Sequence, residues 1–133
     1  FLMANLLQGV VDEGTGRRLR FRYGFKNQIG GKTGTTQNHS DGWFIGITPD
    51  LAGGVWVGAE DRSIHFQNLA NGQGASMALP IWALFMQKVY ADKSLAVPQS
   101  DFQKPNGVNH VLDCGDADRE GMTDYDSSDE IFD

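Results

Sequence analysis

Residues 31–59 read GKTGTTQNHSDGWFIGITPDLAGGVWVGA, and this stretch decides the fold of the chain. Two apolar runs within it, at 43–48 and 55–59, have the length and composition of strands. The link between them, PDLAGG, carries proline, aspartate and two adjacent glycines, which favour a β-hairpin. With GGKTGTT at 30–36 as a third strand, the pattern predicts an antiparallel meander over about residues 30–60 rather than alternating βαβ units.

Helical spacing marks the segments on either side of this meander. Residues 1–12 predict a helix with one apolar stripe, which the glycines of EGTG at 13–16 end. Residues 76–91 predict a second helix, with Pro80 in its first turn, where a missing backbone donor is harmless. The apolar face of this second helix consists of Leu79, Trp82, Met86, Val89 and Tyr90.

Between the first helix and the meander, arginines alternate with apolar residues. Leu19, Phe21 and Tyr23 alternate with Arg18, Arg20 and Arg22, the period of a half-buried strand or extended loop. Because strands 43–48 and 55–59 are apolar on both faces, we expect helices to cover both sides of the sheet. The predicted fold class is therefore α+β, an antiparallel sheet with flanking helices.

Charge divides the chain into two parts. Residues 1–100 hold nine Lys and Arg against seven Asp and Glu, a net of +2, whereas residues 101–133 hold two against ten, a net of −8. We expect residues 1–95 to fold as one piece and residues 96–133 to form an acidic, disordered tail. The near-neutral folded part gives no argument for binding nucleic acid or a membrane surface.

Metal and redox chemistry find little support. His39, His65 and His110 lack metal-ligand spacing, and the single cysteine, Cys114, cannot form an internal disulfide. A calcium-loop spacing begins at Asp116, but its twelfth position is Ser127 in place of a bidentate glutamate. We therefore expect no metal and no cofactor.

The segment KTGTT has the residues of a ligand-binding strand edge. Lys32 supplies a cation, Thr33 and Thr35 supply hydroxyls, and Gly34 removes a side chain that would block an incoming backbone. Strand alternation sets Lys32 with Gly34 and Thr33 with Thr35, so the four cannot share one face, and a ligand would lie along the edge. These groups suit an extended, anionic, peptide-like ligand that adds as a strand. The plain alternative is a turn before a strand.

The stretch GKTGTTQNHSDGWFIGITPDLAGGVWVGAEDR resembles the C-terminal half of the transpeptidase domain of class A penicillin-binding proteins, as do the flanking GTGRR and GASMALPIW. Lys-Thr-Gly is one of three active-site elements of these enzymes and of class A β-lactamases, beside Ser-x-x-Lys and Ser-Asp-Asn. The hairpin and VWVG resemble the synthetic enzymes more closely. The resemblance implies a partial domain of the penicillin-binding-protein fold, whose complete sheet has five strands.

The resemblance also implies roles for residues. Lys32 and Thr33 would bind the carboxylate of a D-alanyl-D-alanine stem peptide or of a β-lactam, and Gly34 would permit close approach. Thr35 would add a hydroxyl to that carboxylate and its backbone N–H to an oxyanion hole. Asp41 matches a position whose role is structural rather than catalytic.

The chain departs from the family pattern in its nucleophile. Neither Ser-x-x-Lys nor Ser-x-Asn occurs in the 133 residues, so the resemblance implies no catalytic side chain here and an inactive fragment. The chain opens within a helical pattern, and we expect it to start mid-protein. The expected partners are stem peptides, β-lactams and the upstream half of the same domain, with no nucleic acid and no membrane contact by this part.

From the family alone we expect an extracytoplasmic, periplasmic location, with an upstream anchor in the inner membrane and an upstream glycosyltransferase domain. Two alternatives to the enzyme fragment stay open. One is a non-catalytic module that binds peptidoglycan peptides or a partner strand at its edge. The other is a structural remnant without a ligand.

Overall fold

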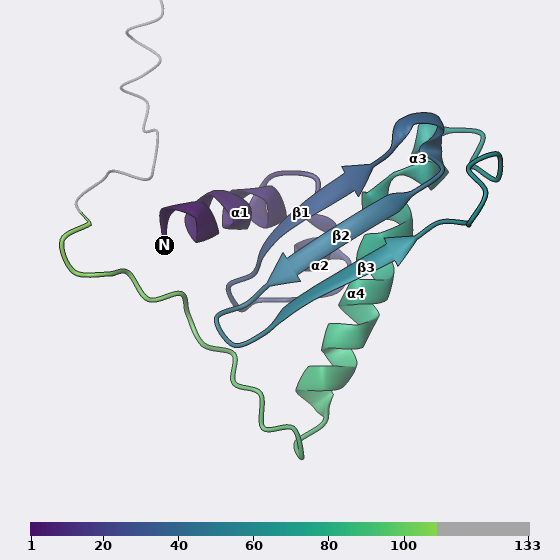
Figure 1. Cartoon of the computed structure of the whole chain (residues 1–133). Helices are drawn as coiled ribbons and strands as arrows, with labels where there is room; N and C mark the ends of the chain where they lie inside the picture. Colours follow the sequence, from purple (N-terminus) through teal and green to yellow (C-terminus); the bar gives the residue numbers. More distant parts are fainter. Residues whose placement is uncertain (109–133) are drawn as a thin grey trace, which may run out of the picture.

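A computed structural model of the chain describes residues 1–108 and shows three strands with helices around them (Figure 1). Two helices precede the sheet, and a short helix and a long one follow it. The elements in chain order are α1 (Leu2–Asp12), α2 (Arg18–Phe21), β1 (Gly30–Thr35), the 3-10 turn η1 (Gln37–His39), β2 (Gly42–Ile47), β3 (Ala52–Val57), α3 (Leu69–Gly72) and α4 (Gly74–Ala91).

The sheet confirms the predicted antiparallel meander. Its order is β1-β2-β3, with Thr35 opposite Gly42 and Gly42 opposite Val57 at one end. A tight hairpin joins β2 to β3, closed by a 2.7 Å bond from the N–H of Thr48 to the carbonyl of Leu51. The predicted fold class, α+β with an antiparallel sheet and flanking helices, is thus correct.

The third strand begins earlier than predicted, at Ala52 rather than at residue 55, and so includes two glycines. Gly53 lies against α4, whose Trp82 indole donates from Nε1 to the carbonyl of Gly53 at 3.1 Å, whereas Gly54 faces Ile45 on the other side of the sheet. In β2, a Cβ on Gly46 would lie less than 3.0 Å from the same ring. The sheet therefore uses backbone without side chains where the largest core residue lies against it.

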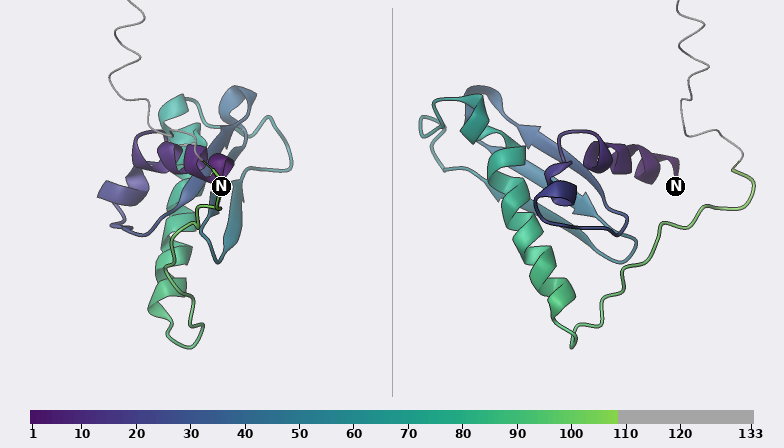
Figure 2. Two further views of the ribbon diagram at one scale, coloured as in Figure 1. Left: turned by 90° about the vertical axis from the view of Figure 1, so that its left-hand side faces the viewer. Right: turned by 180° about the vertical axis from the view of Figure 1, so that it is seen from behind.

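Helix α4 covers one face of the sheet along its length, as a view from behind shows (Figure 2). Its face agrees with the predicted one, and Trp82 contacts Phe44 of β2 edge-on, with ring centroids 5.4 Å apart. The fully or nearly fully buried core is completed from α1, α2 and the segment before β1. Its members are Val11, Leu19, Phe25, Ile29, Phe44, Ala78, Leu79, Trp82, Ala83 and Met86.

Two local predictions are wrong. Residues 18–21 form the short helix α2 rather than a strand or extended loop, since Leu19 turns into the core while Arg18 donates from Nη1 to the carbonyl of Ala75 on α4, 3.0 Å away. Pro80 does not lie in the first turn, because α4 begins at Gly74 and Pro80 is its seventh residue. The helix starts earlier because small residues there fit closely against the sheet.

The opposite face of the sheet is covered only in part, contrary to the expectation of helices on both sides. Helix α1 lies over this face at one end, where its Leu7 approaches Gly30 of β1. Farther along, Trp43, Ile45 and Trp56 are 45%, 51% and 46% exposed. This area of Trp43, Ile45 and Trp56 is called the apolar face below.

Residues 96–108 contain no helix or strand. The calcium-like spacing at 116–127 and Cys114 lie outside the described residues, and the division into residues 1–95 and 96–133 stays a prediction. Within the described part, no helix combines the length and apolar character needed to cross a bilayer.

Candidate functional site

The four residues singled out from the sequence lie together on β1, and the strand register assigns their side chains to two faces. Lys32 and Gly34 pair with Ile45 and Trp43, residues of the apolar face. Thr33 and Thr35 pair with Phe44 and Gly42 and so point to the face that α4 covers. The predicted alternation is present, and a ligand in contact with all four residues has to lie along the strand edge.

Strand β1 is an edge strand of the described sheet. Just beyond it, the N–H of Thr36 donates to the carbonyl of Asp41 at 3.0 Å, toward β2. Successive N–H groups of a strand point to opposite sides, so the N–H groups of Thr33 and Thr35 face outward. An extended ligand can therefore pair with β1 from outside, and the Thr35 N–H is one of the donors that face it.

The Lys32 ammonium lies across this edge. It donates from Nζ to the carbonyl of Thr33 at 2.7 Å, one of the outward-facing backbone groups. Since an ammonium has three donors, two remain for another acceptor.

The start of α4 fixes the Thr35 hydroxyl. The N–H of Gly74 donates to Thr35 Oγ1 at 3.1 Å, which leaves the hydroxyl proton to be donated elsewhere. Gly74 can come this close because it has no side chain: a Cβ there would lie less than 3.0 Å from the carbonyl oxygens of Trp43 and Gly34. A carboxylate beside Thr35 would thus meet a hydroxyl already oriented by the protein.

Thr15 belongs to the same site, although sequence reasoning did not assign it a role. Its Oγ1 is 3.0 Å from Thr33 Oγ1, so the loop between α1 and α2 contacts β1 at the candidate binding edge. The only signal in the sequence is the GTGRR segment, which carries part of the family resemblance without indicating a contact 18 residues away.

Asp41 anchors the loop between β1 and β2. Its Oδ2 accepts hydrogen bonds from Ser40 Oγ and Thr36 Oγ1, each at 3.0 Å, and its Oδ1 accepts one from Trp56 Nε1 at 3.1 Å. The hydrogen bonds from Ser40, Thr36 and Trp56, with the nearby charge of Arg62, lower the pKa of this carboxyl below its ordinary value, against the opposing effect of burial. These contacts support a structural role for Asp41.

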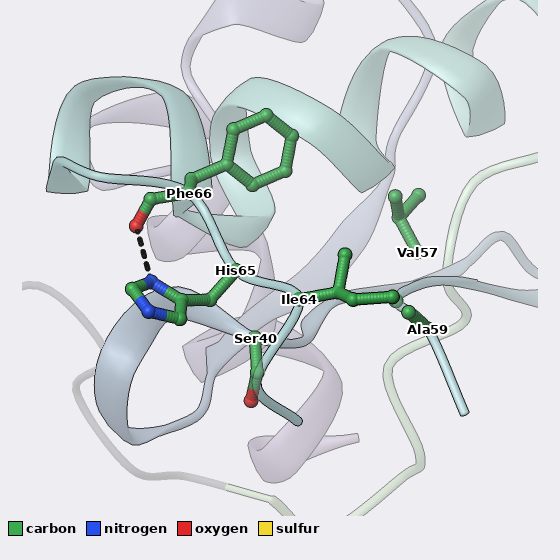
Figure 3. A pocket seen from close by; sticks show the side chains of 7 residues that line it. Ser40, Val57, Ala59, Ile64, His65 and Phe66 are labelled. Atoms are coloured by element: carbon green, nitrogen blue, oxygen red, sulfur yellow. Dashed lines mark hydrogen bonds between the residues drawn. The ribbon is translucent and has the colours of Figure 1, made fainter. Parts of the chain in front are cut away.

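A mostly apolar pocket of about 300 Å³ lies beyond this loop, at the end of the sheet where β3 finishes (Figure 3). His65 closes one side, with Nδ1 3.1 Å from the carbonyl of Phe66. Its lining residues are Ser40, Val57, Gly58, Ala59, Ile64, His65 and Phe66. No motif in the sequence indicates a site at these residues.

Among residues 1–108, no group of three or more His, Cys, Asp or Glu side chains could hold a metal ion. The polar groups that converge in this part of the chain are hydroxyls, backbone amides and cations around β1. They suit the binding of an anionic, extended ligand rather than metal chemistry.

Comparison with known proteins identifies relatives with one common name. No protein-family model matches the chain. Penicillin-binding protein 1A of Pseudomonas aeruginosa is 36% identical over 110 residues, which cover 81% of this chain and 12% of that protein. The Aquifex aeolicus protein of the same name is 36% identical over 101 residues, which cover 76% of this chain and 12% of that protein.

A solved structure agrees with these relatives. The crystal structure of penicillin-binding protein 1A from Haemophilus influenzae superposes with a TM-score of 0.64 at 26% identity, over 77% of this chain and 15% of that one. The chain thus spans about an eighth of the length of the curated relatives it matches. It belongs to the penicillin-binding protein 1A family and corresponds to part of the transpeptidase domain.

Proposed function

We propose that this chain is the substrate-binding part of a peptidoglycan D,D-transpeptidase, and that the edge of β1 binds the D-alanyl-D-alanine end of a stem peptide or a β-lactam. The observation that carries the proposal is the convergence of Lys32, the Thr35 hydroxyl and outward-facing backbone amides on one open strand edge. The similarity to penicillin-binding proteins supports it.

The geometry explains how such a ligand would be held. Its backbone pairs with the outward N–H and C=O groups of Thr33 and Thr35, which sets the register. The Thr35 hydroxyl, fixed by the N–H of Gly74, donates its proton to the carboxylate. The Thr35 N–H donates to the carbonyl oxygen that becomes negative in the transition state, where preorganised donors are most effective.

The nucleophile belongs to a different part of the protein under this proposal. Ser-x-x-Lys is absent from the 133 residues, so the serine that forms the acyl-enzyme and its base come from the upstream half of the domain. That half packs on the apolar face, where Trp43, Ile45 and Trp56 surround the side from which Lys32 projects. The whole protein is then periplasmic and anchored in the inner membrane upstream, and this chain alone is inactive.

Intact-mass spectrometry tests the proposal. The 133-residue chain and a longer product of the same reading frame that includes the upstream sequence are each incubated with penicillin. We expect an adduct of the antibiotic on the longer product only, at a rate that Lys32→Ala lowers. The absence of an adduct on both products would contradict the transpeptidase assignment and favour the alternative, a binding module without a nucleophile.

A further inference from the structure

A second cavity, polar and about 300 Å³ in volume, adjoins the edge of β1 on the side that carries the threonine hydroxyls. Its lining residues are Gly14, Thr15, Arg17, Arg18, Phe21, Gln73 and Ala75. Two contacts tie it to the ligand edge. Thr15 is 3.0 Å from Thr33 through their hydroxyls, and Gly74, between the lining residues 73 and 75, donates to the hydroxyl of Thr35.

The cavity is cationic. Among residues 1–108, two arginines and no carboxylate line it. Arg18 is committed to the fold, because its Nη1 bonds the carbonyl of Ala75 at 3.0 Å and the hydroxyl of Ser76 at 3.2 Å. Arg17 is exposed, and within residues 1–108 its guanidinium makes no hydrogen bond or ion pair. Its five donors are therefore available to an anion.

The two cations of the site lie on different sides of β1. Lys32 projects to the apolar face, whereas the hydroxyls of Thr33 and Thr35 project to the face of α4, where the cavity lies. A carboxylate held by those hydroxyls sits on the cavity side of the edge. Arg17, rather than Lys32, is the unpaired cation on that side.

We propose that Arg17 is a specificity-determining residue that recognises the terminal carboxylate of the ligand at the edge of β1. This inference rests on the proposed function and refines it, since it assigns the carboxylate to the α4 side of the strand. A planar guanidinium matches a carboxylate with two parallel N–H···O bonds, a geometry that an ammonium does not offer. Lys32 then acts mainly on other groups at the opposite face.

The test compares a peptide acid with its neutral amide. The isotope-labelled 133-residue chain is titrated with N-acetyl-D-alanyl-D-alanine and with its C-terminal amide, and both dissociation constants are taken from amide chemical shifts. The wild type should prefer the acid. Arg17→Gln should lower the acid-to-amide affinity ratio roughly tenfold or more, the usual effect of removing a charged hydrogen bond, while binding of the amide changes little.

Matched variants distinguish the effect of the charge at Arg17 on binding from the effects of net charge and of damage to the fold. Arg22→Gln removes the same charge from another exposed arginine that does not line the cavity, and should leave the ratio unchanged. Arg17→Lys keeps the charge without the planar fork and should give an intermediate ratio. A change in folding would move the affinities for acid and amide together, so the ratio isolates carboxylate recognition.

The outcomes distinguish this inference from the proposed function. If the wild type binds the acid, Lys32→Ala weakens binding and Arg17→Gln leaves the ratio unchanged, Arg17 is not the carboxylate residue, although the proposed function stands. If the wild type binds neither peptide, both proposals are overturned. An equal loss of preference in Arg17→Gln and Arg22→Gln would show general charge attraction and would also overturn the assignment.

Discussion

Substitution of Gly74 by alanine separates two physical effects of opposite sign. Gly74 is the first residue of α4, and alanine in place of glycine in a helix normally stabilises it by up to about 1 kcal/mol. Here the new Cβ would lie less than 3.0 Å from the carbonyl oxygens of Gly34 and Trp43, which belong to the paired strands β1 and β2 and cannot rotate away.

The clash should outweigh the gain in helix propensity. Overpacking of this kind costs roughly 1–3 kcal/mol. Displacement of the start of α4 also breaks the 3.1 Å hydrogen bond from the Gly74 N–H to Thr35, worth about 1 kcal/mol. After subtraction of the propensity gain, Gly74→Ala should destabilise the chain by about 1–3 kcal/mol. For a folded part of about 100 residues this lowers the midpoint of thermal unfolding by roughly 10 °C.

Thermal and urea unfolding of the full chain, followed by circular dichroism, measures this effect. Gly9→Ala in α1 is the matched control, because no atom lies within 4 Å of its added Cβ, and it should be neutral or stabilising. Gly74→Ala should also weaken binding of the peptide acid, since Thr35 loses the donor that orients its hydroxyl. If Gly74→Ala were as stable as Gly9→Ala, the close contact between α4 and the strand edge would be refuted.

Three further predictions concern other parts of the fold. Hydrogen bonds and Arg62 lower the pKa of the Asp41 carboxyl, so the stability that its charged form contributes is full above the ordinary aspartate pKa of about 4 and is lost as the pH falls through the lowered pKa. The difference in unfolding free energy between the wild type and Asp41→Asn, measured from pH 7 to pH 2, should therefore shrink toward acid. A difference that stays constant over this range would contradict the linkage. Trp82→Ala removes a 1% exposed ring and should cost about 3–5 kcal/mol in urea unfolding, whereas Trp43→Ala, at a 45% exposed position, should cost less than half as much. The exposed apolar face should cause the chain to self-associate, and replacement of Trp43 and Ile45 by threonine should reduce this association in sedimentation measurements without loss of strand pairing. Unchanged association would show that the apolar face is not responsible.

Local patterns carry most of what the sequence predicts correctly. The strands, the hairpin and the long helix follow from hydrophobic period and turn residues within windows shorter than 20 residues, so β2, β3 and α4 are found nearly in place. The alternation of Lys32 to Thr35 along β1 is predicted for the same reason, since the four residues are adjacent, and their role in ligand binding stays a prediction. Which side of the edge faces α4 could not be predicted from those residues.

The errors and omissions come from contacts between distant residues. The alternation at 18–23 indicates a half-buried strand or extended loop, but burial of Leu19 and the bond from Arg18 to Ala75, 57 residues away, select a helical turn. The polar cavity combines the 14–18 loop with residues 73 and 75, so no local window contains it. Nothing in the sequence separates Arg17 from Arg18, Arg20 and Arg22, whereas the fold shows that Arg18 and Arg20 have partners.

The arrangement of Lys32 has a consequence for which ligands the edge accepts. An open strand edge pairs readily with any extended chain, and a lysine on the edge is one way in which proteins oppose such pairing. Here the Lys32 ammonium donates to the outward-facing carbonyl of Thr33. A neutral strand that pairs with β1 has to displace the ammonium from this carbonyl, and it offers the ammonium no acceptor of similar strength. Under the proposed role of Arg17, a ligand that ends in a carboxylate gains a contact with this arginine on the α4 side of the strand, which a neutral strand lacks. Under both proposals, the edge would select extended ligands that end in a negative group, because Lys32 lies on one side of β1 and Arg17, just before α2, lies on the other.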